Sequence, residues 1–437
     1  MIFTMQKIRE SRYLQWALYL FVLGCALHIF LALRSWIGGD QIYLLSLGLD
    51  YSLHGHLQPF AKMMSGAGAN PGILMQLLVG IPLMVLQHFQ SPMILIILIH
   101  IIGGALFLAV IKDGLGERAA FIAVIAYWLS PWRLYNAGFL WEPSYIFLPA
   151  AAHLWACYTS REKASLLPSF ILGLSLFTAI QIHNSAFVLI LLTVFLILRK
   201  NIKLRWVSFL GGIVAGSLTL IPALLSIIQG TIPEARASEG YIGWSFVKIY
   251  PALKGIVYWF TLGAIDMVRP LKETVFLSDQ YQTLHGAWSV ERIWIHLLQF
   301  ICVLSVVISI RASWWWWRKN KTEEQKSTKN EDWLRQYAMG SAICLFVSAA
   351  LSPIVLQGWQ VVIVLHSAVL PVIVWTDQKF LQCDHASRRW RWLCMYVLFE
   401  LLVIFTLAHG LYIFSNPGIL PQEVHQNKEL LHIILQP

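Results

Sequence analysis

The sequence predicts an all-α protein, a polytopic bundle of about eleven transmembrane helices. Hydrophobic residues make up 58% of the 437-residue chain, and charged residues only 12%. A soluble domain carries about 25% charged residues, so this chain has too little charge to cover a solvated surface. The same composition excludes disordered and collagen-like chains. The six cysteines are scattered and include no CxxC pair, so neither a zinc finger nor a disulfide framework is indicated.

Apolar stretches long enough to cross a bilayer recur along the whole chain. The first, 14–34, follows three basic residues, and we expect a retained signal-anchor helix with its N-terminus in the cytoplasm. The other ten predicted spans are 92–111, 119–135, 143–159, 166–182, 185–198, 206–228, 293–311, 334–352, 360–376 and 392–413.

The distribution of Lys and Arg gives the orientation, because cytoplasmic loops retain basic residues. Eleven spans place 22 of the 32 basic residues inside, together with 10 of the 22 acidic residues. The formal net charge of +10 therefore reflects membrane topology, and a nucleic-acid role is excluded. The inside segments are 1–13, 112–118, 160–165, 199–205, 311–335 and 377–391.

Two further apolar stretches, 72–88 and 249–265, are ambiguous. If either crossed the membrane alone, the seven basic residues of 311–335 would face outward. We therefore expect both to be helices at the outer surface, with a joint crossing as the alternative. Trp314–Trp317 is interpreted as an interfacial anchor, and 422–435 as a short outer helix.

This topology divides the chain into three parts. Residues 1–230 form the expected catalytic core, which includes the large outer loop 35–91. Residues 231–292 form another large outer loop, with an interfacial helix, and 293–437 supply the C-terminal spans and a short outer tail.

The first outer loop contains the leading catalytic candidate. Asp40 follows Gly38-Gly39 directly, and the segment 42–54 has helical periodicity. The predicted helix is amphipathic and lies on the membrane. Its polar side holds Tyr43, Ser46, Asp50 and His54. Asp40 lies at the N-terminal end, where the helix dipole favours a carboxylate. The residues alone therefore leave two roles for Asp40 equally open, a helix cap and a catalytic carboxylate.

A second pair of candidates lies where the third span ends and the fourth begins. Arg133 follows Ser130-Pro131, and Glu142 directly precedes Pro143, a residue typical of a first helical turn. Two interpretations are open. The pair forms an ion pair with Glu142 as a helix cap, or both side chains line the cavity that contains Asp40.

Several other polar residues lie outside in this topology. Lys62 is an outward base that contacts a phosphate or is simply solvated, and His183 lies at the outer end of the fifth span. His54, His56 and His285 are also outside, but their spacing predicts no specific metal site. No metal ligand is therefore assigned, and a divalent metal stays open. Glu400 and the histidines within spans are expected to be helix–helix hydrogen-bond partners, with a second site at Glu400 as the alternative.

These motifs together resemble the GT-C membrane glycosyltransferases, and within them the protein O-mannosyltransferases and the lipid A aminoarabinose transferase. The resemblance covers mainly residues 1–230. It rests on Gly39-Asp40, on Asn70-Pro71-Gly72 at the start of a surface helix, and on Ser130-Pro131 through Glu142-Pro143. Many relatives have Asp-Glu in the first loop, whereas this chain has Asp40-Gln41, which weakens the case for a metal there.

The resemblance implies a sugar transferase that is active on the periplasmic face of an inner membrane. The donor would be a polyprenyl-phosphate sugar, and the acceptor a lipid, a glycan or a protein. Asp40 would match the first-loop catalytic carboxylate, and Glu142 the acidic residue of the second loop. Transfer would invert the anomeric centre, with Asp40 as general base and with Lys62 or Arg133 stabilising the phosphate. Further expected substrate contacts are Tyr43, His183 and His285.

Two other functions stay open on the sequence. A lipid-linked sugar transporter or flippase would need charged residues deep in the membrane, and Glu400 is the one acidic residue well inside a predicted span. An O-antigen ligase or polymerase would fit the outer loop 229–292 with its several basic residues.

Overall fold

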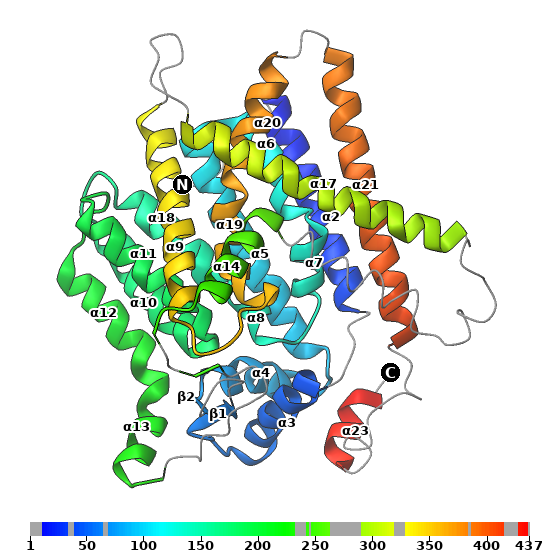
Figure 1. Cartoon of the computed structure of the whole chain (residues 1–437). Helices are drawn as coiled ribbons and strands as arrows, with labels where there is room; N and C mark the ends of the chain where they lie inside the picture. Colours follow the sequence, from blue (N-terminus) through cyan, green and yellow to red (C-terminus); the bar gives the residue numbers. More distant parts are fainter. Residues whose placement is uncertain are drawn as a thin grey trace.

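The computed structural model describes residues 11–33, 39–63, 69–231, 242–243, 246–262, 290–318, 328–382, 386–414 and 427–435. Within these ranges the fold is a helical bundle with one small two-stranded hairpin (Figure 1). The all-α prediction is confirmed at this level.

Helices occupy the predicted spans, often with bounds within a few residues. Single long helices are α2 (Arg12–Ala32), α5 (Ser91–Leu115), α10 (Leu166–Ile182), α17 (Val290–Arg318), α18 (Lys329–Leu351) and α21 (Ala386–Phe414). The other predicted spans are built from shorter helices. These are α6 (Glu117–Ala123) with α7 (Pro131–Ala137), α8 (Glu142–Tyr145) with α9 (Phe147–Thr159), α11 (Phe187–Leu198), α12 (Trp206–Ser217) with α13 (Ile221–Ile228), and α19 (Leu365–Ala368) with α20 (Leu370–Gln382).

Helix length and composition support fewer crossings than the predicted eleven. Among the described residues, five helices are long and apolar enough to span a bilayer, and a pair bent by 41° makes a sixth. The bent pair joins Gly358–Ala368 to Leu370–Gln382. In Figure 1, α17 lies across the other long helices instead of beside them. Hydropathy counts apolar residues but does not fix how a helix is oriented, so the total of eleven stays a prediction.

The loops that base counting assigns to the cytoplasm gather at one end of the bundle. Four contacts join them: Arg118 Nε with Asp377 at 2.5 Å, Arg161 with Asp113 at 3.6 Å, Lys329 with Glu162 at 3.6 Å, and Trp333 Nε1 with the Asn201 carbonyl at 2.9 Å. The shared end agrees with the predicted grouping of these loops. The hairpin and the helices α3 (Gly39–His54) and α4 (Leu74–Val85) lie at the opposite end (Figure 1).

The two ambiguous apolar stretches are short helices. α4 has 12 residues and α14 (Ile249–Thr261) has 13. At 1.5 Å per residue each is about 20 Å long or less, too short for the roughly 30 Å hydrocarbon core. α4 packs against α3, and α14 packs against α18. Their lengths therefore agree with the expectation that neither stretch crosses alone.

A hairpin that the sequence did not predict connects α3 to α4. Strand β1 (Phe60–Met63) pairs antiparallel with β2 (Ala69–Pro71), with Lys62 opposite Asn70. α3 packs against α4, and its Leu44, Leu45 and Leu49 are buried. Gly48 and its partner Gly80 lie at the crossing of the two helices, where a side chain on either would meet the other helix. The first outer loop is thus a packed subdomain.

The tryptophan run belongs to the last turns of α17. Trp314 is exposed, and the Arg318 guanidinium lies 3.6 Å from its ring centre, which suits an interfacial anchor. Trp316 is buried and donates its indole N–H to Glu331 at 3.1 Å. The interpretation of all four tryptophans as an anchor was therefore wrong for Trp316. The outer tail contains a helix as predicted, α23 (Lys428–Leu435).

Glycines allow α10 and α12 to pack with their backbones in contact. A Cβ on Gly173 would collide with the Phe209 carbonyl, and one on Gly212 with the Phe170 carbonyl. Small residues at such crossings are typical of membrane helix pairs, where close backbone packing drives association. The neighbouring Gly211 faces open space, and its nearest atom to an added Cβ is a Phe170 ring carbon at 3.9 Å.

These adjacent glycines give a matched test of the packing. Gly212→Ala forces two backbones apart, so we expect a clearly lower thermal midpoint for the detergent-purified protein. Gly211→Ala should leave the midpoint unchanged or raise it, since Ala favours a helix by about 1 kcal/mol over Gly. Equal effects of the two substitutions would contradict the described crossing of α10 and α12.

Candidate functional site

The second outer loop begins where α6 ends in a π-helical turn, Val124–Trp128. Pro131 lacks an N–H, so the carbonyls at this helix end need other donors. The fully buried Trp128 ring fits against Gly24 of α2 and Gly104 of α5, and stacks on Phe21 at 4.4 Å between ring centroids. Trp128 therefore fixes the start of this loop against two long helices.

Arg133 is fully buried directly beside Trp128. Its Nε and one terminal nitrogen donate to the Trp128 carbonyl at 2.9 and 2.6 Å, and its guanidinium carbon lies 3.9 Å from the Trp128 ring centre. The other terminal nitrogen donates to His100 Nδ1 at 3.1 Å. The planar guanidinium thus donates to the Trp128 carbonyl at the end of the helix, and the face of the Trp128 ring stabilises its positive charge.

His100 connects Arg133 to Ser144 at the other end of the loop. Because arginine can only donate, His100 Nδ1 accepts, and its Nε2–H donates to the Ser144 carbonyl at 2.8 Å. His28 of α2 bonds the Ala137 carbonyl at 2.8 Å. The Ser144 hydroxyl donates back into the loop, to Asn136 and Phe139 carbonyls. The loop is therefore held from within by α2 and α5.

Glu142 lies on this anchored loop. It is the first residue of α8 and only 6% exposed, and Trp141 is the N-cap. Glu142 is therefore a residue of the first turn of α8, and the interpretation of Glu142 as the helix cap was wrong. The contacts described for Arg133 are with Trp128 and His100, so an Arg133–Glu142 ion pair, one of the two open interpretations, is not among them. The carboxylate lies at a helix N-terminus, which stabilises a negative charge.

Asp40 lies in the first turn of α3, directly after the end of α2, and its side chain is exposed. Tyr43, one turn later, is 39% exposed. The predicted amphipathic helix is confirmed, since Ile42, Leu45 and Leu49 are buried while Asp40 is not. Both carboxylates therefore open short or surface helices, one in each of the first two outer loops.

A buried amide network joins the first outer loop to α10 and α12. Asn70 donates to the Gln181 carbonyl at 2.6 Å, and the Gln181 side chain bonds Gly216 and Thr219. Gly72 has a φ of +99°, and an added Cβ would lie 2.9 Å from the Gln181 side-chain oxygen. The Asn-Pro-Gly sequence is therefore the point where α4 docks on the bundle.

The other residues predicted to contact the substrate include Lys62, His183 and His285. The backbone of Lys62 pairs in β1, but its side chain lies outside the described side chains, as does the whole of His285. His183 is half-buried, and its Nδ1 accepts the Ser185 N–H at 3.1 Å at the start of α11. The substrate roles of Lys62, Tyr43, Arg133, His183 and His285 stay predictions.

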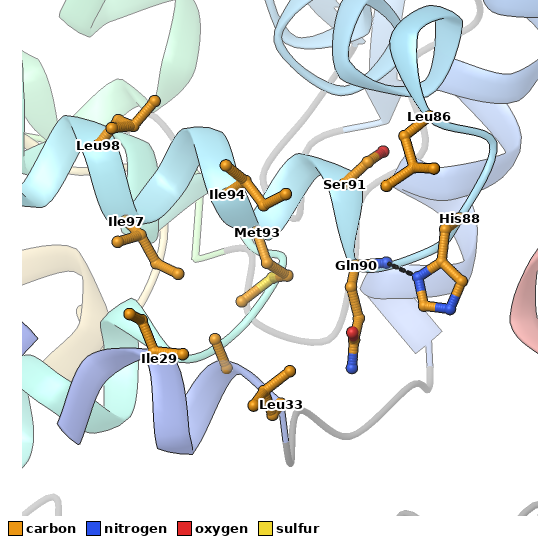
Figure 2. A pocket seen from close by; sticks show the side chains of 11 residues that line it. Ile29, Leu33, Leu86, His88, Gln90, Ser91, Met93, Ile94, Ile97 and Leu98 are labelled. Carbon is orange, nitrogen blue, oxygen red and sulfur yellow. Dashed lines mark hydrogen bonds between the residues drawn. The ribbon is translucent and has the colours of Figure 1, made fainter. Parts of the chain in front are cut away.

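An apolar cavity of about 330 Å³ opens between α2 and α5, at the end of the bundle that carries the first outer loop (Figure 2). Its walls are mainly aliphatic, as shown by Ile29, Leu33, Ile94, Ile97 and Leu98. Ser91, Gln90 and His88 lie together at one end, where the His88 ring accepts the Gln90 N–H at 3.2 Å. The cavity suits an apolar chain with a polar group at one end.

Some histidines inside the spans pair across helices as expected, but His366 Nε2 has no partner among the described residues and His296 bonds Gln299 of its own helix. His153 of α9 bonds Tyr337 of α18 at 2.8 Å and Thr193 of α11 at 2.9 Å. The Thr193 hydroxyl donates to Leu189, so it accepts from His153, and the tyrosine donates to the other ring nitrogen. Glu400 is buried, and neither of its carboxylate oxygens has a hydrogen-bond partner on another helix among the described residues, so the expected helix–helix role of Glu400 was wrong there.

Comparison with solved structures identifies several similar chains. Two of them are crystal structures of ArnT from Cupriavidus metallidurans, one bound to undecaprenyl phosphate and one in the apo state. Each superposes with a TM-score of 0.52 over 92% of this chain and 76% of ArnT, at 12% and 13% identity.

The chain has the fold of ArnT. The resemblance stated from short motifs in residues 1–230 is therefore confirmed at the level of fold, and it extends over nearly the whole chain. No protein-family model matches the sequence, and no curated protein matches it. The likeness to ArnT thus rests on three-dimensional structure, with little sequence identity behind it.

Sequence reasoning missed the residues that position the two outer loops. Ser144, Gln181 and Gln76 are all buried and hydrogen-bonded to backbone groups. A single uncharged polar residue in an apolar run did not by itself indicate a buried hydrogen bond. The signal available was the high cost of burying a polar group in a membrane protein, which applies to glutamines as well as to charged residues.

The Arg133 cluster predicts a stability effect that differs from that of a surface arginine. Arg133→Met leaves the Trp128 carbonyl and His100 Nδ1 without their donor, which costs about 1–3 kcal/mol. Arg133→Lys should recover only part of this loss, since lysine lacks the bidentate fork. Arg205→Met, at an exposed position, is the control and should change the free energy of unfolding by less than about 0.5 kcal/mol. Thermal unfolding in detergent measures all three, and an Arg133→Met variant as stable as Arg205→Met would contradict the cluster.

Proposed function

We propose that this protein is a GT-C type membrane glycosyltransferase that moves a sugar from a polyprenyl-phosphate donor to an acceptor on the periplasmic side of the inner membrane. One observation carries the proposal. The chain has the fold of ArnT, a protein crystallised with undecaprenyl phosphate. The proposed base, Asp40, lies in the first turn of α3, the helix that follows α2.

Asp40 is proposed as the general base. It removes the proton from the acceptor nucleophile while that atom attacks the anomeric carbon. The bond from this carbon to the phosphate oxygen breaks, and the electron pair leaves with the polyprenyl phosphate, so the configuration inverts. The exposed position of Asp40 supports access by an acceptor, and the helix N-terminus favours its charged form.

The leaving phosphate needs positive charge beside it. Lys62 is proposed for this role, because it is a base in the same outer loop as Asp40. Arg133 is engaged by Trp128 and His100, so its proposed contribution is to hold the loop of Glu142 in place. Glu142 is proposed as the second carboxylate of the site, with Tyr43, His183 and His285 as substrate contacts.

The cavity between α2 and α5 is proposed to take part of the polyprenyl chain. Its aliphatic walls match an isoprenoid, and Leu33, which lines it, is the residue that follows α2. Asp40 is seven positions after Leu33, and seven extended residues span at most about 25 Å. A lipid tail in this cavity therefore has its head within reach of the first outer loop.

The proposal predicts the loss of transfer without loss of folding when the base is neutralised. Asp40→Asn should lower the rate about 10²–10⁴-fold, the usual contribution of a general base. Its matched control is Glu162→Gln, an exposed carboxylate at the opposite end whose only described partner is a surface lysine. The assay follows release of polyprenyl phosphate from a polyprenyl-phosphate sugar by purified protein.

Wild-type protein should release the carrier, and Glu162→Gln should match it. A flippase would move the lipid without cleaving it, so a protein that transports but never releases carrier phosphate would overturn the transferase assignment. Near-normal release by Asp40→Asn would remove Asp40 as the base.

A further inference from the structure

Two histidines and an aspartate converge at the C-terminal end of α3. Asp50 and His54 are one helical turn apart, and Asp50 Oδ1 lies 3.3 Å from His54 Nδ1. Gly55 then adopts a φ of +69° and its N–H bonds the Tyr51 carbonyl, which turns the chain back over the helix. As a result His56 Nδ1 lies 3.1 Å from the same Asp50 oxygen.

Buried groups hold this arrangement in place. The Gln76 side chain of α4 is completely buried, donates to the His56 carbonyl at 2.7 Å and accepts the Gln58 N–H at 2.9 Å. Gln58 in turn donates to the second Asp50 oxygen at 3.3 Å. Slight burial raises the pKa of the Asp50 carboxyl, but hydrogen bonds from His56, Gln58 and His54 outweigh it and lower that pKa overall. Hydrogen bonds from Gln58 and the buried Gln76 therefore hold Asp50 and His56 in a fixed arrangement.

The spacing matches the needs of a transition metal. Bonds of about 2.0–2.1 Å in a tetrahedral zinc site place neighbouring ligand atoms about 3.3 Å apart. The two distances to Asp50 are 3.3 and 3.1 Å, and all three ligand atoms lie within 4.8 Å of one another. A helix C-terminus also favours a positive charge. Imidazole with carboxylate is a ligand set typical of zinc.

We propose that Asp50, His54 and His56 form a zinc site on the surface of the first outer loop. Three protein ligands leave a fourth position for water or for another group. The site stands about ten residues along α3 from Asp40, a rise of about 15 Å. It is therefore separate from the proposed sugar-transfer chemistry and does not depend on that proposal.

The site also reaches the C-terminal part of the chain. Glu429 of α23 lies 3.9 Å from His54 Nε2, the ring nitrogen that points away from Asp50. Zinc-binding histidines usually direct their second ring nitrogen to a carboxylate, which orients the ring. Zinc on His54 would strengthen this contact and so fasten α23 to α3, two helices from opposite ends of the sequence.

The test measures zinc binding by the full-length protein in detergent, with any affinity tag removed and with prior EDTA treatment. Wild-type protein should bind one zinc ion, measured by competition with a chromophoric chelator. His54→Ala and His56→Ala should each weaken binding by more than tenfold. Glu429→Gln removes a carboxylate that contacts His54 but is not itself a proposed ligand, and it should weaken zinc binding by about tenfold. His432→Ala removes an exposed histidine of α23 outside the cluster and should bind as wild type does.

A second readout follows amide hydrogen exchange in 428–435. Zinc should slow exchange there in wild type and His432→Ala, but not in His54→Ala. All these side chains are exposed or half-exposed, so the variants should fold, and equal melting temperatures without zinc check this. Absence of zinc binding by wild type, or unchanged binding by a His54→Ala/His56→Ala double variant, would overturn the proposal.

Discussion

The arrangement of the outer loops depends on one buried cation. Arg133 lies inside the bundle, where an unpaired guanidinium would be prohibitively costly, and it is paired with the Trp128 carbonyl, the Trp128 ring and His100. Those partners belong to the end of one helix and the middle of another. Satisfying Arg133 therefore fixes the path of the chain from Ser130 to Ser144, and with it the position of Glu142.

The first outer loop is also held in place by buried polar groups, which here are uncharged amide side chains. The side chains of Asn70, Gln181 and Gln76 donate to backbone carbonyls in the buried interior. α3 and α4 then pack as a small layer on one end of the bundle (Figure 1), with Asp40 at its exposed edge. Thus both loops that carry the proposed carboxylates are held by hydrogen bonds to the helices beneath them. This is the kind of rigid support that a catalytic site requires.

The sequence predicted the helices well because hydropathy and periodicity are local. Residues 166–182 form a helix with those bounds, and the surface helix after Asp40 was found from its apolar stripe. The partners of Arg133 and Asn70 were not predicted. His100 is 33 residues from Arg133, and Gln181 is 111 from Asn70, so only the folded chain brings them together. The contact of His56 with Asp50 was missed because Gly55 breaks the helical spacing that would have linked the two residues.

A structure of the protein with a polyprenyl-phosphate sugar and an acceptor would test the account most directly. We expect an Asp40 oxygen within about 2.6–3.2 Å of the acceptor nucleophile, the range of a general base in place. Glu142 should line the same pocket, while Arg133 keeps its bonds to Trp128 and His100 behind it. A sugar bound far from both outer loops, or Arg133 released onto the phosphate, would contradict the account.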